Sequence, residues 1–111
     1  MCEMQFAVSF GLTNVQNELI KEYLSNKNYK LFISADFADI ITNDAPLLII
    51  NASMLERGQL DLICEYYCKS DERFRKKVFW IGYPKPCDDL RIRFVCIQRF
   101  GELIFYLNSK V

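Results

Sequence analysis

The feature that most constrains the fold is a pair of short segments that are apolar at nearly every position. One is LLII (47–50), which follows Pro46, and the other is KVFWIG (77–82). A strand with one face in water alternates apolar and polar side chains, whereas a strand without this alternation is covered on both faces, as at the centre of a parallel sheet. The sequence therefore predicts an α/β protein with a mostly parallel sheet.

The remaining segments complete an alternating pattern of strands and helices, and the helices show the three-to-four-residue apolar spacing of amphipathic helices. Strands are predicted over 6–10, 29–34, 47–52, 77–82 and 92–97, and helices over 15–25, 36–44, 59–68 and 99–109. This order implies right-handed crossovers that place helices on both faces of one five-stranded sheet. We therefore expect a single three-layer domain spanning residues 1–111.

The first predicted helix has a recognisable start and two distinct sides. Thr13 followed by Gln16 has the spacing of a capping box. The helical spacing assigns an apolar set to the buried side and a polar set to the exposed side. The buried set is Val15, Leu19, Ile20, Tyr23 and Leu24, and the exposed set is Asn17, Glu18, Lys21, Glu22 and Ser25.

The C-terminal third leaves one alternative open. The connection from Tyr83 to Arg91 has nine residues and two prolines. A parallel crossover usually needs about ten to twelve residues, so either the fourth helix is shortened or missing, or the fifth strand is antiparallel. Beyond it, Phe100, Leu103, Ile104 and Leu107 have helical spacing, which favours a closing helix over a hairpin that turns at Phe100–Gly101.

The residue inventory excludes several kinds of chemistry. The chain has no histidine, which excludes Ser/His/Asp and Cys/His catalysis and every zinc site that uses histidine. Five cysteines at irregular positions do not suggest a secreted disulfide framework. Cys64 and Cys68 lie one helical turn apart, which we attribute to core packing rather than metal binding.

No membrane association is expected from the sequence. No apolar run approaches the roughly 20 residues of a membrane span, and no basic segment precedes the short apolar stretch at the N-terminus. We therefore expect a cytoplasmic protein.

Charge is balanced overall but unevenly distributed. Residues 1–72 carry five basic and eleven acidic side chains, whereas residues 73–111 carry nine basic and three acidic ones. Much of the basic excess lies in the cluster of Arg73, Arg75, Lys76 and Lys77. Such a cluster is compatible with a nucleic-acid surface, but it lacks the interleaved aromatic residues of a single-strand binder, so we favour a solvated surface.

Two motifs give the chain a resemblance to a known family. NASMLERG places Asn51, Met54 and Gly58 after the third predicted strand, and IQRFGEL places Gln98, Arg99 and Phe100 at the end of the fifth. In these segments the chain resembles the receiver domains of response regulators. The resemblance implies a flavodoxin-like fold with strand order 2-1-3-4-5.

The same resemblance implies that the phosphoacceptor site has been lost. Asn51 stands where receivers have the aspartate that accepts phosphoryl, and an amide is a poor nucleophile. Ser9 and Phe10, or Phe10 and Gly11, stand where the family has an acidic pair for magnesium. Gly82 replaces the family's hydroxyl residue, and Gln98 replaces its lysine. We therefore expect a non-enzymatic module with no catalytic residue, cofactor or metal.

Protein–protein binding is the activity that these observations leave. On the predicted last helix, Phe105 points away from the apolar stripe and Tyr106 lies beside it, and a trimmed fourth helix would expose Phe94. An outward aromatic surface is typical of an interface. We expect a homodimer, or a complex with another protein, through Phe94, Phe105 and Tyr106. The alternative is a nucleic-acid-associated regulator that uses the basic cluster.

Overall fold

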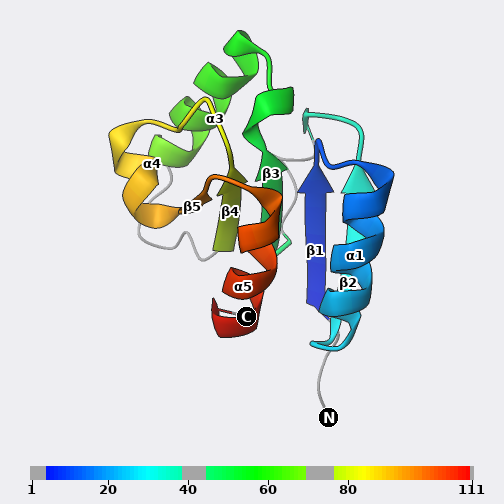
Figure 1. The fold of residues 1–111 in the computed structure, drawn as a ribbon. Coiled ribbons are helices and arrows are strands. Elements are labelled where there is room, and N and C mark those ends of the chain that lie inside the picture. Colours follow the sequence, from blue (N-terminus) through cyan, green and yellow to red (C-terminus); the bar gives the residue numbers. More distant parts are fainter. Residues whose placement is uncertain (1–4, 39–44, 70–76, 111) are drawn as a thin grey trace.

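A parallel five-stranded sheet with helices on both faces forms the protein, as a computed structural model shows for residues 5–38, 45–69 and 77–110 (Figure 1). The elements follow one another in the order β1 (Gln5–Phe10), α1 (Asn14–Ser25), β2 (Tyr29–Ser34), β3 (Leu47–Asn51), a 3-10 helix (Ala52–Met54), α3 (Arg57–Lys69), β4 (Lys77–Ile81), α4 (Asp88–Arg93), β5 (Val95–Ile97) and α5 (Phe100–Lys110). The predicted helix over 36–44 falls mainly on residues outside the described ranges.

The strand order in the sheet is β2-β1-β3-β4-β5, and every neighbouring pair is parallel. Leu48 lies in register between Val8 of β1 and Val78 of β4. The fully apolar strands β3 and β4 therefore occupy the interior of the sheet, where both faces are covered. The prediction of a mostly parallel sheet from these two segments is confirmed.

The connection before β5 contains a helix of its own. The short α4 spans Asp88–Arg93, and β5 then pairs with β4 in parallel. The fourth helix is thus shortened, as one of the two predictions had it, and the antiparallel alternative is wrong. The predicted fifth strand over 92–97 began too early, because residues 92 and 93 belong to α4 and the strand starts at Val95. A cis peptide bond between Tyr83 and Pro84 lies in the preceding loop.

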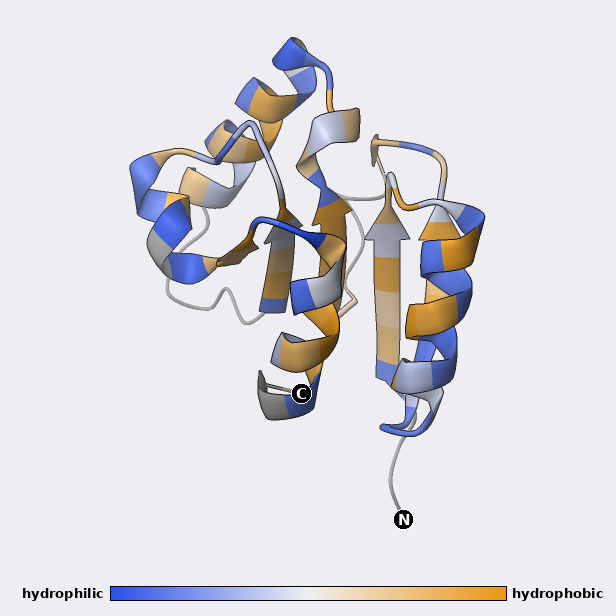
Figure 2. Ribbon diagram, in the orientation of Figure 1, coloured by the Kyte–Doolittle hydropathy of each residue, from blue (hydrophilic) through white to orange (hydrophobic). Residues whose placement is uncertain are grey.

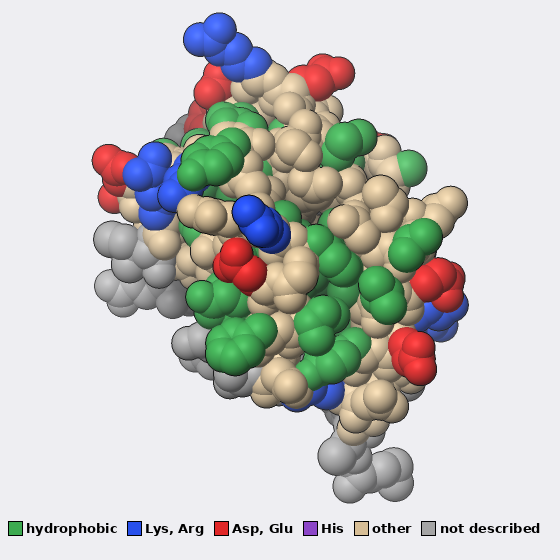
Figure 3. Space-filling model, viewed as in Figure 1, with side chains coloured by type: hydrophobic (Ala, Val, Ile, Leu, Met, Phe, Trp, Pro, Cys, Tyr) green, Lys and Arg blue, Asp and Glu red, His purple; other side chains and the backbone are tan. Residues whose placement is uncertain are grey.

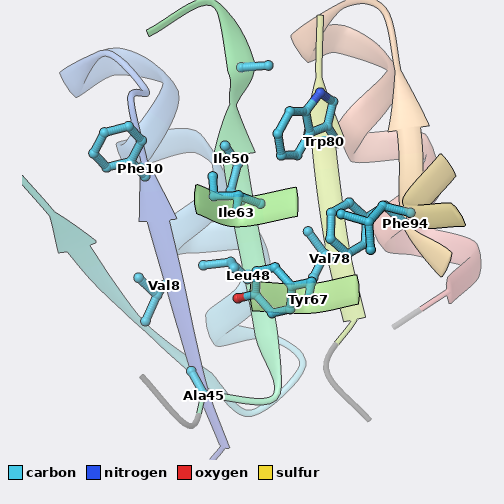
Figure 4. Close-up of a cluster of buried hydrophobic side chains, with 12 residues drawn as sticks. Val8, Phe10, Ala45, Leu48, Ile50, Ile63, Tyr67, Val78, Trp80 and Phe94 are labelled. Carbon is cyan, nitrogen blue, oxygen red and sulfur yellow. The ribbon is translucent and has the colours of Figure 1, made fainter. Parts of the chain in front are cut away.

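Two apolar clusters, one on each face of the sheet, form the core. On one face, alternate residues of β1, β3 and β4 pack against Ile63 and Tyr67 of α3 and Leu90 of α4 (Figure 4). On the other face, the intervening residues pack against Ile20 and Leu24 of α1 and against α5. Figure 2 shows the largely hydrophobic strands in the middle of the molecule and helices in which hydrophobic and hydrophilic residues alternate.

The start of α1 is as predicted, and Ile20 and Leu24 are buried as predicted, but the rest of its buried side is only partly as expected. Thr13 and Gln16 form a reciprocal capping box at the first turn. Val15 and Leu19, predicted to be buried, are 71% and 54% exposed. Asn17, predicted to face water, is buried instead. A hydrogen bond accounts for the burial of Asn17. Its side-chain oxygen accepts a 2.7 Å hydrogen bond from the buried Ser9 hydroxyl of β1, so this side of α1 faces the sheet.

The last segment is helical, so the hairpin alternative for residues 99–109 is wrong. Leu103 and Leu107 of α5 are fully buried, and Phe100 and Ile104 pack beside them. None of the described helices is long and apolar enough to cross a membrane.

Candidate functional site

The C-terminal ends of the strands meet along one edge of the sheet, and this edge is the candidate site. The arrows of the sheet point the same way in Figure 1, so the residues after β1, β3 and β4 lie along that edge. They are Gly11, Asn51 with the 3-10 helix, and Gly82. In open α/β sheets, ligands usually bind at this edge.

Asn51 closes the end of β3 with both ends of its amide. Its side-chain Nδ2 donates a 3.0 Å hydrogen bond to the Gly11 carbonyl, across from β3 to the loop after β1. Its Oδ1 accepts from the Ser53 hydroxyl at 2.8 Å and from the Ser53 backbone N–H at 3.3 Å, and so caps the 3-10 helix. An aspartate has no donor for the Gly11 carbonyl when ionised. The amide therefore serves as a structural clamp between two strand ends.

Gly11 lets the chain pass close to the segment after β3. It has φ of +81°, a left-handed conformation that favours glycine. A β-carbon built at this position would lie 2.9 Å from the β-carbon of Met54 and 3.2 Å from that of Asn51. Met54 therefore lies against the Gly11 backbone.

Ser9 and Phe10 point to opposite faces of the sheet. Ser9 is fully buried toward α1, and its hydroxyl donates to Asn17, whose Nδ2 donates in turn to the Leu12 carbonyl at 3.3 Å. Phe10 lies on the other face, with its ring edge against Phe37 at a centroid distance of 6.4 Å. These two predicted site residues therefore belong to the core.

Gly82, at the end of β4, lies beside the end of β5, where Gln98 follows the strand. The Gly82 N–H donates a 2.8 Å hydrogen bond to the Ile97 carbonyl, and a β-carbon at Gly82 would lie 4.0 Å from the Gln98 carbonyl. Gly82 has φ of +79° and Gln98 is exposed. This corner has neither a hydroxyl side chain at 82 nor a cationic side chain at 98 with which to hold a phosphoryl group.

One carboxylate at this edge escaped the sequence reasoning. Asp36 follows β2, and its Oδ1 accepts a 3.0 Å hydrogen bond from the Ala38 N–H. An Asp two residues before a helical turn is a signal that could have identified this local bond. Within residues 5–38, 45–69 and 77–110, no group of three or more acidic or cysteine side chains is arranged to hold a metal ion.

The predicted partner surface is only partly as expected. Phe105 is 70% exposed on α5, and the ring of the half-buried Tyr106 lies edge-on to it at 5.7 Å. Phe94, predicted to be exposed, is buried, which is a correction. Its ring stacks on Trp80 at 5.9 Å and meets Tyr67 edge-on at 5.6 Å. Phe94 is the residue that follows the end of α4, and its side chain belongs to the apolar cluster on this face of the sheet.

Exposed apolar side chains also occur on α1, in the same layer as α5. Val15 and Leu19 lie on the open outer side of the helix, together with polar residues such as Glu18 and Lys21. Figure 3 shows hydrophobic side chains gathered on the face of the molecule that α5 and α1 form. The sequence analysis missed Val15 and Leu19 because it assigned both to the core.

Most of the predicted basic cluster cannot be placed. Arg73, Arg75 and Lys76 lie outside the described residues, and Lys77 is exposed at the start of β4. Two arginines later in the chain have structural roles. Arg91 donates to the Pro86 carbonyl and pairs with Asp88 at 3.5 Å, and Arg93 donates to the Tyr67 carbonyl at 2.9 Å. The nucleic-acid hypothesis stays a prediction.

The fold and the site together define the class of the molecule. It is an α/β protein with a five-stranded parallel sheet, in which Asn51 at the end of the central strand β3 hydrogen-bonds to the loop after β1. Comparison of the chain with protein-family models, with curated proteins and with solved structures found no match.

Proposed function

We propose that the protein is a non-enzymatic, receiver-like interaction module with a flavodoxin-like fold, which acts by self-association through the outer surface of α5. The observation that carries the proposal is the hydrogen bonding of Asn51. This side chain occupies the phosphoacceptor position of the receiver motif, and both ends of its amide bind neighbouring groups of the same chain.

The chemistry of the strand ends supports the non-enzymatic part of the proposal. A neutral amide neither accepts a phosphoryl group nor contributes charge to magnesium binding. The β- and γ-carbons of Met54 lie 2.9 and 3.0 Å from where a β-carbon at Gly11 would be, so no side chain can extend from residue 11 toward Asn51. Gly82 and Gln98 supply no hydroxyl or cation.

The surface of α5 supports the interaction part. Phe105 is 70% exposed and points away from Leu103 and Leu107, the residues that anchor the helix to the sheet. A large exposed aromatic ring costs free energy in water, which is recovered when a second surface covers it. Val15 and Leu19 extend the apolar character of this layer onto α1.

The test is the molar mass in solution of the wild type and of Phe105→Glu, measured by light scattering across a concentration series. We expect a dimer for the wild type and a shift toward monomer for the variant. Leu62→Glu is the matched control, because Leu62 is 52% exposed on α3, in the opposite layer, and its substitution should leave the dimer intact. A wild-type monomer at high micromolar concentration contradicts the proposal.

The lost phosphoacceptor site has its own test. Adding magnesium and beryllofluoride, a mimic of a bound phosphoryl group, should change neither the thermal midpoint nor the molar mass of the wild type. A saturable stabilisation that requires both compounds would show that the site is functional.

A further inference from the structure

Two cysteines of α3 and a third from the loop before α4 come together between these two helices. Cys64 and Cys68 lie four residues apart on α3, and Cys87 immediately precedes α4. The sulfur atoms of Cys68 and Cys87 are 3.2 Å apart, and Cys64 lies close enough to Cys87 for the two thiols to affect each other's ionisation. All three are free thiols. Sequence spacing predicted the neighbourhood of Cys64 and Cys68 but not the approach of Cys87.

The distance suits a disulfide between Cys68 and Cys87. The two sulfurs must close from 3.2 Å to the bonded distance of about 2.05 Å, a movement of roughly 1 Å. Cys68 is exposed and Cys87 is partly exposed, so a small reagent in water can reach this pair. Cys96, by contrast, lies on β5, and burial raises the pKa of its thiol.

The surroundings of the pair assign a different role to each sulfur. Burial opposes ionisation of Cys87, but the hydrogen bond with the Cys68 thiol, together with smaller effects of Leu90 and Cys64, outweighs it and lowers the pKa of Cys87. The hydrogen bond to Cys87, followed by weaker effects of burial and nearby charge, raises the pKa of Cys68 to about 11. Cys87 is thus the more readily ionised thiol of the pair, and Cys68 is the neighbouring thiol.

We propose that Cys68 and Cys87 form an oxidative modification site that a hydroperoxide converts into an intramolecular disulfide. In the first step the Cys87 thiolate attacks a peroxide oxygen, the O–O bond breaks, and the departing oxygen takes up a proton, which leaves a sulfenic acid on Cys87. In the second step the Cys68 sulfur attacks the Cys87 sulfur. The S–O bond breaks, and hydroxide leaves with the Cys68 proton as water. Hydrogen peroxide gains two electrons from the two thiols and becomes two molecules of water.

The disulfide cross-links α3 to the residue that begins α4. It closes a loop that contains β4, and Cys87 packs against the apolar cluster in which Phe94 stacks on Trp80. This cross-link is independent of the self-association proposed above, because it involves the opposite layer of the molecule.

The test is peptide mapping of the full chain after brief treatment with one equivalent of hydrogen peroxide and blocking of the remaining thiols. We expect two of the five thiols to be lost and a linked pair of tryptic peptides that carry residues 58–69 and 78–91. Cys64 and Cys68 share one peptide, so fragmentation between them identifies the linked sulfur. Cys64→Ser and Cys96→Ser should still form the link, and Cys87→Ser should not.

Three results would each overturn the proposal: retention of all five thiols, a predominant link between Cys64 and Cys87, or disulfides only between chains. The decisive map is made on the wild type, so it does not depend on the folding of any variant. The circular dichroism of Cys87→Ser shows whether loss of the link reflects loss of the sulfur or of the fold.

Discussion

At the scale of single residues, Asn51 shows how one atom changes what a strand end can do. Its Nδ2 donates to a backbone carbonyl of the neighbouring loop, a bond that an ionised carboxylate cannot make. Its Oδ1 still accepts bonds from Ser53, as a carboxylate oxygen also can. An amide here joins β3 to the loop after β1, whereas a carboxylate would repel that carbonyl.

The first prediction concerns this clamp. Asn51→Asp should lower the free energy of unfolding by about 1–2 kcal/mol, because the Gly11 carbonyl loses its donor and faces a negative oxygen. Urea denaturation at neutral pH measures the change. Asn108→Asp introduces the same charge at an exposed position of α5 and is the control. Equal stabilities of Asn51→Asp and wild type would show that the clamp contributes little.

The second prediction concerns the buried pair of Ser9 and Asn17. Asn17→Ala removes the acceptor for the Ser9 hydroxyl and should cost about 1–3 kcal/mol. Ser9→Ala should then be less damaging in the Asn17→Ala background than in the wild type, because the hydroxyl has already lost its partner. A double-mutant cycle measures this coupling, and strict additivity would argue against it.

At the scale of secondary-structure elements, the capping box of α1 gives the third prediction. Thr13→Ala removes the acceptor for the Gln16 backbone N–H and should cost about 1 kcal/mol of stability. Thr13→Ser keeps the hydroxyl and should retain most of the wild-type stability. Thermal unfolding followed by far-UV circular dichroism makes the comparison, and identical losses in the two variants would argue against the capping role.

Strand positions could be read from the sequence because their chemistry is local. Pro46 and the unbroken apolar runs at 47–50 and 78–81 place the central strands directly. The short α4 was obscured by Pro84 and Pro86, although its ends carry the expected charges. Asp88 and Asp89 lie in its first turn and Arg91 and Arg93 in its last, the arrangement that suits a helix dipole.

The errors on α1 and at Phe94 have a different origin, because both depend on contacts between distant segments. Helical periodicity alone does not fix how α1 is rotated about its axis. Two rotations fit the pattern, and they differ in whether Asn17 faces the sheet or the solvent. The Ser9 hydroxyl, eight residues away, decides between them. Likewise, Phe94 is buried because Tyr67 and Trp80 surround it, and no local pattern announces these neighbours. At the candidate site, the sequence identified which residues lie at the strand ends but did not reveal the close contact between Gly11 and Met54.

At the scale of the whole molecule, the two apolar clusters share one sheet, so they should unfold together. Trp80 lies in one cluster and Leu24 in the other. Leu24→Ala should cost about 2–5 kcal/mol, and it should shift the unfolding midpoints seen by Trp80 fluorescence and by far-UV circular dichroism equally.

The control for this fourth prediction lies on the same helix. Leu19 is 54% exposed, so Leu19→Ala should change the free energy of unfolding by less than about 0.5 kcal/mol. If Leu24→Ala moved only the circular dichroism transition, the two faces of the sheet would be separate folding units. If Leu19→Ala were as damaging as Leu24→Ala, the orientation described for α1 would be wrong.

Because Gly11 and Met54 lie so close together, each of these positions should restrict which residues related sequences can carry at the other. No residue larger than glycine fits at position 11 while the β-carbon of Met54 stays in its present place. Descendants of a common ancestor that replace the glycine should therefore also remodel the loop that carries the methionine. These two sites, 43 positions apart in the printed sequence, are then expected to covary.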